Sequence, residues 1–108
     1  MDLTRARPAS DQYSVEEQMD TVKAKHILVD QEYECQDIIK KIEDGSSFEE
    51  MAEKFSKCPS GQRGGDLGEF GRGRMVKAFE EAAFELAVDQ VSAPVQTQFG
   101  YHLIKRYE

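Results

Sequence analysis

The sequence predicts an α+β domain in which helices cover one small sheet. Residues 22–29 alternate as in a strand, residues 31–55 and 76–87 space their apolar side chains as helices do, and residues 95–107 hold two short β runs. Helices interspersed among few strands, with a hairpin at the end, are typical of this class. A chain of 108 residues can bury one core and is too short for two.

Charge and hydropathy argue against several partners. The chain has 14 basic and 21 acidic residues, a net charge of −7, so nucleic acid and anionic membranes should repel it. No apolar run approaches the ~20 residues that cross a bilayer, and the start of the chain lacks a hydrophobic stretch typical of a signal peptide. We therefore expect a cytoplasmic protein, unless the chain is a domain cut from a longer exported one.

The predicted domain occupies residues 22–108. Residues 1–21 are polar and without a sustained period, which indicates a flexible N-terminal tail or an expression remnant, although Ser14 and Glu17 have capping-box spacing. The first strand, "VKAKHILV", puts His26 among apolar neighbours on one face.

Two helices should follow. The segment "QEYECQDIIKKIEDG" predicts a helix capped by Gly45, and Ser47 with Glu50 predicts the start of a second one. The apolar side of the first carries Cys35, Ile38, Ile39 and Ile42. The second is expected to bury Phe48, Met51, Ala52 and Phe55.

The stretch "CPSGQRGGDLGEFGRGRM", residues 58–75, holds six of the eight glycines. It matches neither the phosphate loop GxxxxGK[ST] nor a dinucleotide GxGxxG between strand and helix, so nucleotide binding is disfavoured. The plain interpretation is that these glycines serve turns and close packing. Within it "DLGEF" predicts a short strand and "GRGRM" a tight loop. The helix that follows should place on one side Val76, Phe79, Ala83 and Leu86.

The last segment, "VQTQFGYHLIKRY", reads as a hairpin that turns near Phe99 and Gly100. It contains His102, and His26 is the only other histidine. If the two strands are neighbours, the two imidazoles can form a hydrogen bond. Taken alone, each is more typical of a satisfied, half-buried histidine than of a catalytic one.

The two cysteines, Cys35 and Cys58, form neither a CxxC pair nor a Cys/His cluster of zinc spacing. We expect two free thiols and no metal site.

Three segments together resemble the parvulin family of peptidyl-prolyl cis/trans isomerases: "KHILV", "FSKCPSGQRGGDLGEFGRGRMVKAFEEAAF" and "PVQTQFGYHLIK". They occur in the right order between residues 22 and 107, and the pattern is most similar to small single-domain bacterial parvulins and to isomerase domains of exported foldases. The resemblance implies a four-stranded antiparallel sheet surrounded by four helices, in the order βαααβαββ.

The resemblance also implies a site. Its catalytic residues would be His26, Cys58, Thr97 and His102. Its proline pocket would be Leu67, Met75, Phe79 and Phe99, with Phe70 close by. No cofactor is implied, and the partners would be proline-containing peptides or unfolded protein segments, bound by a monomer.

Rotation about an X-Pro bond faces a barrier of about 18–20 kcal/mol, set by amide resonance. A dry apolar pocket around the proline ring would lower it, since water's hydrogen bonds to the carbonyl favour the planar amide. Cys58 is then either a nucleophile or a polar group that tunes the local field, and we favour the second because a thiol adduct needs an activating base.

Phosphate-directed relatives carry cations in the loop after the first strand, whereas this chain has "DQEYE". We therefore expect no phosphate requirement and a preference for apolar or basic residues before proline, with the directions of Arg63, Arg72 and Arg74 left open. Two other functions stay open: a holding module that binds apolar segments without catalysis, and, more weakly, a thiol redox enzyme that uses Cys58.

Overall fold

The computed structural model describes residues 21–108, so the expected tail, with the spacing at Ser14, lies outside the described residues apart from Thr21, which opens the first described strand. The elements in order are β2 (Thr21–Val29), α2 (Glu32–Glu43), α3 (Phe48–Phe55), the 3₁₀ helix η1 (Pro59–Arg63), β3 (Asp66–Gly71), α4 (Lys77–Glu85), β4 (Val95–Thr97) and β5 (Gly100–Arg106). The predicted α+β class and element order are confirmed, with η1 as a short third helix.

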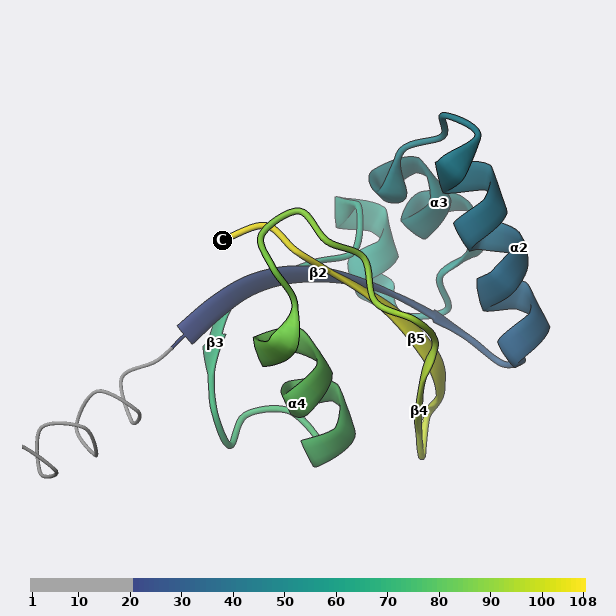
Figure 1. Cartoon of the computed structure of the whole chain (residues 1–108). Coiled ribbons are helices and arrows are strands. Elements are labelled where there is room, and N and C mark those ends of the chain that lie inside the picture. Colours follow the sequence, from purple (N-terminus) through teal and green to yellow (C-terminus); the bar gives the residue numbers. More distant parts are fainter. Residues whose placement is uncertain (1–20) are drawn as a thin grey trace, which may run out of the picture.

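The sheet has four antiparallel strands in the order β3-β2-β5-β4, with β2 and β5 in the middle. β2 pairs with β3 from Thr21 to Lys25 and with β5 from Ala24 to Val29. The first and last described strands therefore lie side by side, as the histidine argument required. Figure 1 shows α2 and α3 at one side of the sheet and α4 at the other.

Each face of the sheet buries its own apolar cluster, because alternate strand residues point to opposite faces. The cluster under α2 and α3 consists of Ile27, Val29, Cys35, Ile38, Phe48, Met51, Ala52 and Leu103. The cluster under α4 consists of Val22, Ala24, Phe70, Phe79, Ala83, Leu86 and Ile104. Both imidazoles lie on the α4 face, since their strand neighbours Ala24 and Ile104 do.

The helix caps follow local chemistry. α3 is capped by Ser47, whose hydroxyl accepts the Glu50 N–H at 3.0 Å, as the capping-box spacing predicted. α2 begins after Gln31, whose N–H donates to the Glu34 carboxylate at 3.0 Å, a cap that the sequence analysis did not single out. Gly45, with φ +117°, follows the end of α2.

Two predictions about residues at helix ends are wrong: the burial of Phe55 and the place of Val76 within a helix. Phe55 is 42% exposed, because α3 ends at this residue and the chain leaves the helix to run beside Leu28. Val76 is 38% exposed, because it is the extended N-cap of α4 (φ −60°, ψ 151°) rather than a helical residue. In the described part of the chain, no helix is long and apolar enough to cross a bilayer.

Candidate active site

The two histidines form a buried pair across β2 and β5. The distance between His26 Nδ1 and His102 Nδ1 is 3.1 Å, and the exposed fractions of the two residues are 6% and 5%. The rings stack with an interplanar angle of 19°. The hydrogen bond expected from neighbouring strands is therefore present.

Burial keeps the pair neutral. It lowers the pKa of His26 to about 4, with a smaller contribution from the positive charge that His102 would carry, and it also lowers the pKa of His102. A bond between two Nδ1 atoms needs one donor and one acceptor, which two neutral rings of opposite tautomer provide.

Further hydrogen bonds extend the pair at both ends. His102 Nε2 lies 2.8 Å from Thr97 Oγ1, which also accepts the Phe99 N–H at 3.1 Å. His26 Nε2 lies 3.2 Å from Ser60 Oγ, whose hydroxyl donates to Cys58 Sγ at 3.3 Å. One polar chain thus joins Thr97 to Cys58.

The direction of the bond from Ser60 to Cys58 determines which atom donates in every other bond of the chain. If Ser60 donates to the sulfur, its oxygen accepts from His26 Nε2–H, so His26 Nδ1 is an acceptor and His102 Nδ1 carries the proton. His102 Nε2 then accepts from the Thr97 hydroxyl. Every member donates toward Cys58, an arrangement in which each bond polarises the next.

Ser60 is a site residue that no sequence motif indicated. It is buried, 4% exposed, and lies 34 residues from its histidine partner. Its only local signal is its place two residues after Cys58, in a turn that Pro59 starts.

The glycine-rich stretch brings this turn against β2. The His26 N–H donates to the Gly65 carbonyl at 2.9 Å, and Gly65 has φ +85°. A Cβ there would lie 2.3 Å from the His26 carbonyl oxygen, so only glycine permits this approach. The glycines therefore hold the Cys58–Ser60 turn beside the histidine pair.

An aromatic ring covers the pair. The ring centroid of Phe79, on α4, lies 5.5 Å from that of His26 and 5.2 Å from that of His102, both edge to face. Leu67 and Met75 are half-buried and pack on the same apolar cluster as Phe79. Phe70 lies 6.1 Å from Phe79, between ring centroids.

Three of the four predicted pocket residues therefore gather on one cluster. The fourth, Phe99, is 60% exposed on the β4–β5 turn and connects to the polar chain through its backbone N–H.

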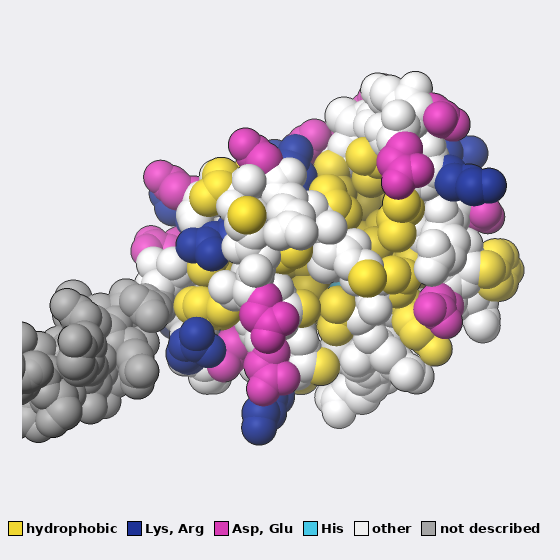
Figure 2. All heavy atoms as spheres, viewed as in Figure 1, with side chains coloured by type: hydrophobic (Ala, Val, Ile, Leu, Met, Phe, Trp, Pro, Cys, Tyr) yellow, Lys and Arg dark blue, Asp and Glu magenta, His cyan; other side chains and the backbone are white. Residues whose placement is uncertain are grey.

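Figure 2 shows hydrophobic side chains gathered between the α2–α3 end and the β4–β5 hairpin, with almost no histidine surface visible.

Two of the three arginines with open directions have partners. Arg72 lies 3.6 Å from the Glu80 carboxylate, and its guanidinium carbon lies 4.2 Å from the Phe84 ring centroid. Arg63 donates to the Asp66 carbonyl at 3.4 Å.

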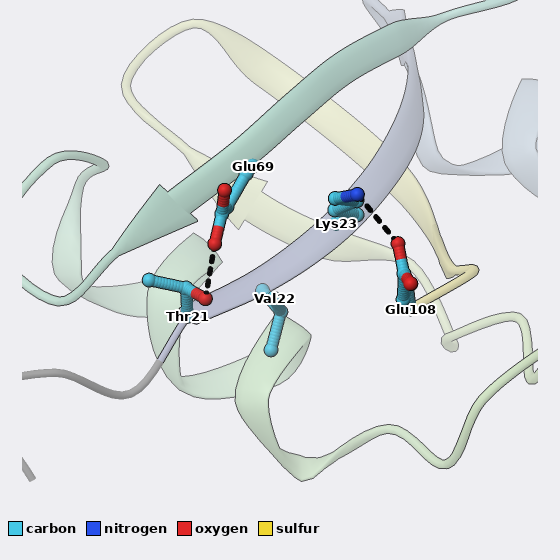
Figure 3. Close-up of a pocket in the computed structure, with 5 residues that line it drawn as sticks. All are labelled: Thr21, Val22, Lys23, Glu69 and Glu108. Atoms are coloured by element: carbon cyan, nitrogen blue, oxygen red, sulfur yellow. Dashed lines mark hydrogen bonds and ion pairs between the residues drawn. The ribbon is translucent and has the colours of Figure 1, made fainter. Parts of the chain in front are cut away.

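A separate hollow lies at the start of β2 (Figure 3). Its lining residues are Thr21, Val22, Lys23, Glu69 and Glu108. Thr21 donates to Glu69, and Lys23 pairs with Glu108, both at 2.6 Å. These bonds satisfy its charges within the hollow, and it carries none of the predicted site residues.

Comparison with known proteins matches this chain to the Rotamase family, PPIC-type PPIASE domain, over residues 15–108. The foldase protein PrsA of a Geobacillus strain is 49% identical over 85 residues. Peptidylprolyl isomerase (PrsA) from Bacillus anthracis superposes with a TM-score of 0.81 at 42% identity, covering 91% of this chain and 46% of that one. NmPin, the parvulin of Nitrosopumilus maritimus, gives a TM-score of 0.76 at 42% identity, covering 82% of this chain and 97% of that one.

The match to the Geobacillus foldase covers 78% of this chain and 31% of that protein. The chain thus spans about a third of the curated relatives' length. This match does not support the expectation of a cytoplasmic protein. It is compatible with the alternative stated above, a domain of a longer foldase.

Proposed function

The chain belongs to the Rotamase family of PPIC-type peptidyl-prolyl isomerase domains, and we propose that it accelerates rotation about X-Pro bonds in unfolded or flexible polypeptides without a covalent intermediate. The observation that carries this proposal is the unbroken polar chain from Thr97 to Cys58 under the ring of Phe79.

The apolar pocket supplies most of the proposed transition-state stabilisation. Acceleration by a thousand- to a hundred-thousand-fold requires only about 4–7 kcal/mol of preferential transition-state stabilisation. The proline ring would be surrounded by Leu67, Met75, Phe79 and Phe99. These side chains would keep water away from the carbonyl, where its hydrogen bonds stabilise the planar amide. The twisted amide, which has less double-bond character, is thereby favoured over the planar one.

The polar chain provides a fixed field beside this pocket. Because Cys58 Sγ accepts from Ser60, its own S–H can point outward to the carbonyl before the proline. Thr97, His102 and His26 hold this donor in place without gaining or losing a proton. Preorganised dipoles of this kind need no rearrangement as the bond rotates.

The same geometry argues against a thiolate nucleophile. Ser60 stands between Cys58 and His26, so no imidazole contacts the sulfur, and the neutral His26 directs a donor rather than an acceptor toward it.

The substrate we propose carries no phosphate. Asp30 and Lys57 form an ion pair at 2.5 Å, so the lysine at this edge is neutralised by the acidic loop. Apolar or basic residues before proline therefore fit this acidic loop better than a phosphate dianion does. We take the domain to act as a monomer.

Isomerisation of short X-Pro peptides, followed by NMR exchange or a protease-coupled assay, tests the function. Cys58→Ser should keep most of the activity, whereas Met75→Ala should cost more, because the pocket and not the thiol lowers the barrier. Absence of any rate enhancement at micromolar protein would refute isomerase function, and loss of all activity in Cys58→Ser would favour the covalent route.

A further inference from the structure

A groove lies between α2 and the end of α3, on the sheet face opposite the histidine pair. Its lining residues are Val29, Tyr33, Glu34, Asp37, Ile38, Lys41 and Phe55. Its volume is about 280 Å³, just under the ~300–1,000 Å³ of small-molecule sites, which suits the side chains of a peptide better than a cofactor.

Two aromatic residues flank this groove without being buried. Tyr33 is 66% exposed and Phe55 is 42% exposed, while Val29 and Ile38 beneath them are buried. Single exposed apolar residues are ordinary, but two exposed aromatic rings around one concavity with an apolar floor are typical of an interaction site.

The charge of the groove selects the occupant. Glu34 and Asp37 line it against one lysine, Lys41, and Glu32 precedes them on the same helix. Among the described residues Asp37 has no ion pair. Carboxylates beside exposed aromatic rings favour arginine or lysine, whose stems pack on apolar surface while the charge stays in water.

The groove adjoins the proline site around the end of β2. Leu28 pairs with His102 on the site's face, and the next residue, Val29, is part of the groove floor. The Lys57 N–H donates to the Leu28 carbonyl at 2.8 Å, so the segment from Phe55 to Cys58 passes from one face to the other. A peptide bound along the same path would cross the end of β2 as extended chain, which advances about 3.3–3.6 Å per residue.

On the premise of the isomerase function above, we propose that this groove is a second subsite for the same substrate chain. It takes an apolar or aromatic residue beside an arginine or lysine, three to five residues from the proline. The domain therefore prefers extended basic segments to short or acidic ones. The Asp30–Lys57 pair lies under the stretch of peptide that joins the two subsites.

Peptides of two lengths test this subsite. The short peptide has four residues, one of which is proline. Two long peptides contain the same four residues and carry an added pair four residues from the proline on both sides. The added pair is Arg-Leu in one long peptide and Glu-Gly in the other. The measured quantity is the ratio of kcat/KM for long to short peptide. We expect Arg-Leu to raise this ratio about two- to five-fold, the size of one exposed cation–π contact with its packing, and Glu-Gly to leave it near one.

Two variants locate the effect. Phe55→Ser and Asp37→Lys should each return the Arg-Leu ratio toward one. Val88→Ser, a similarly exposed apolar residue near the opposite end of β5, should keep the full ratio. A ratio near one in the unaltered protein, or a raised ratio that survives both groove variants, overturns the subsite and leaves the isomerase function standing. Failure of the short peptide to react at all refutes the isomerase function itself.

Discussion

Each histidine of the pair has both ring nitrogens engaged, which leaves neither free to act as a base. His26 contacts His102 and Ser60, and His102 contacts His26 and Thr97. The rings therefore act as rigid connectors, and their tautomers are set by the hydroxyl groups at the ends of the chain.

Ser60→Ala tests this linkage. The variant leaves His26 Nε2 without its partner and removes the donor to Cys58, so kcat/KM should fall about three- to ten-fold, the value of one or two hydrogen bonds. Nitrogen chemical shifts of the imidazoles should change in the same variant, because the hydroxyl group at the Ser60 end no longer fixes the tautomer of His26. Ser47→Ala, which removes a serine bond at the start of α3, should lower stability by about 1 kcal/mol while leaving the shifts unchanged. Wild-type shifts in Ser60→Ala would contradict the linkage.

The buried histidines also make stability depend on pH. The pKa of His26 falls from 6.5 to about 4 on folding, so between these values the unfolded chain binds a proton that the folded protein does not. The free energy of unfolding should therefore be highest above pH 6.5 and fall as pH decreases toward 4, by up to about 3 kcal/mol. Denaturant unfolding at several pH values measures this. His26→Gln should flatten the curve in this window, and a curve that rises on acidification would be incompatible with a neutral buried pair.

At the scale of elements, periodicity predicted the strands and helices because each follows from neighbours a few residues apart. It failed at element ends. Phe55 continues the apolar spacing of α3, but the helix stops there, and Val76 precedes α4 as an extended residue. The role of Ser60 depends on its contact with His26 on β2, which no local pattern encodes.

Gly65→Ala tests whether the close approach of the loop after η1 to β2 is needed for stability and activity. Alanine would meet the His26 carbonyl at 2.3 Å in addition to the strain of a positive φ, so we expect a loss of about 2–4 kcal/mol in stability, with kcat/KM also reduced. Gly68→Ala is the matched control, since Gly68 has φ +70° and open space around its Cβ, and should cost about 1–2 kcal/mol of strain only. Thermal unfolding and the peptide assay compare the two. Equal losses would show that the close approach to β2 does not matter.

At the scale of the whole molecule, the polar chain of the site draws on β2, η1, β4 and β5, with α4 covering it. Thr97 and Cys58 lie at opposite ends of a polar chain whose central bond joins residues 76 positions apart in sequence. The family resemblance could name most of these residues, because the motifs carry them. The order in which they are bonded could not be read from the sequence, since it depends on the register of two distant strands and on one close glycine contact.

The net charge of −7 gives the whole chain a field that a substrate meets before any single contact. A phosphoserine before proline brings ~2 negative charges and should be repelled, whereas an arginine there should be attracted. We expect kcat/KM for a phosphoserine-proline peptide to be about ten-fold below that of its unphosphorylated form at ~0.01 M salt, where the screening length is ~30 Å, and the gap to narrow at ~1 M, where it is ~3 Å. The arginine-proline peptide should show the reverse trend and serves as the control. A phosphopeptide that reacts faster than its unphosphorylated form at low salt would mean that a local cation, such as Arg74, outweighs the overall field and that the domain is phosphate-directed.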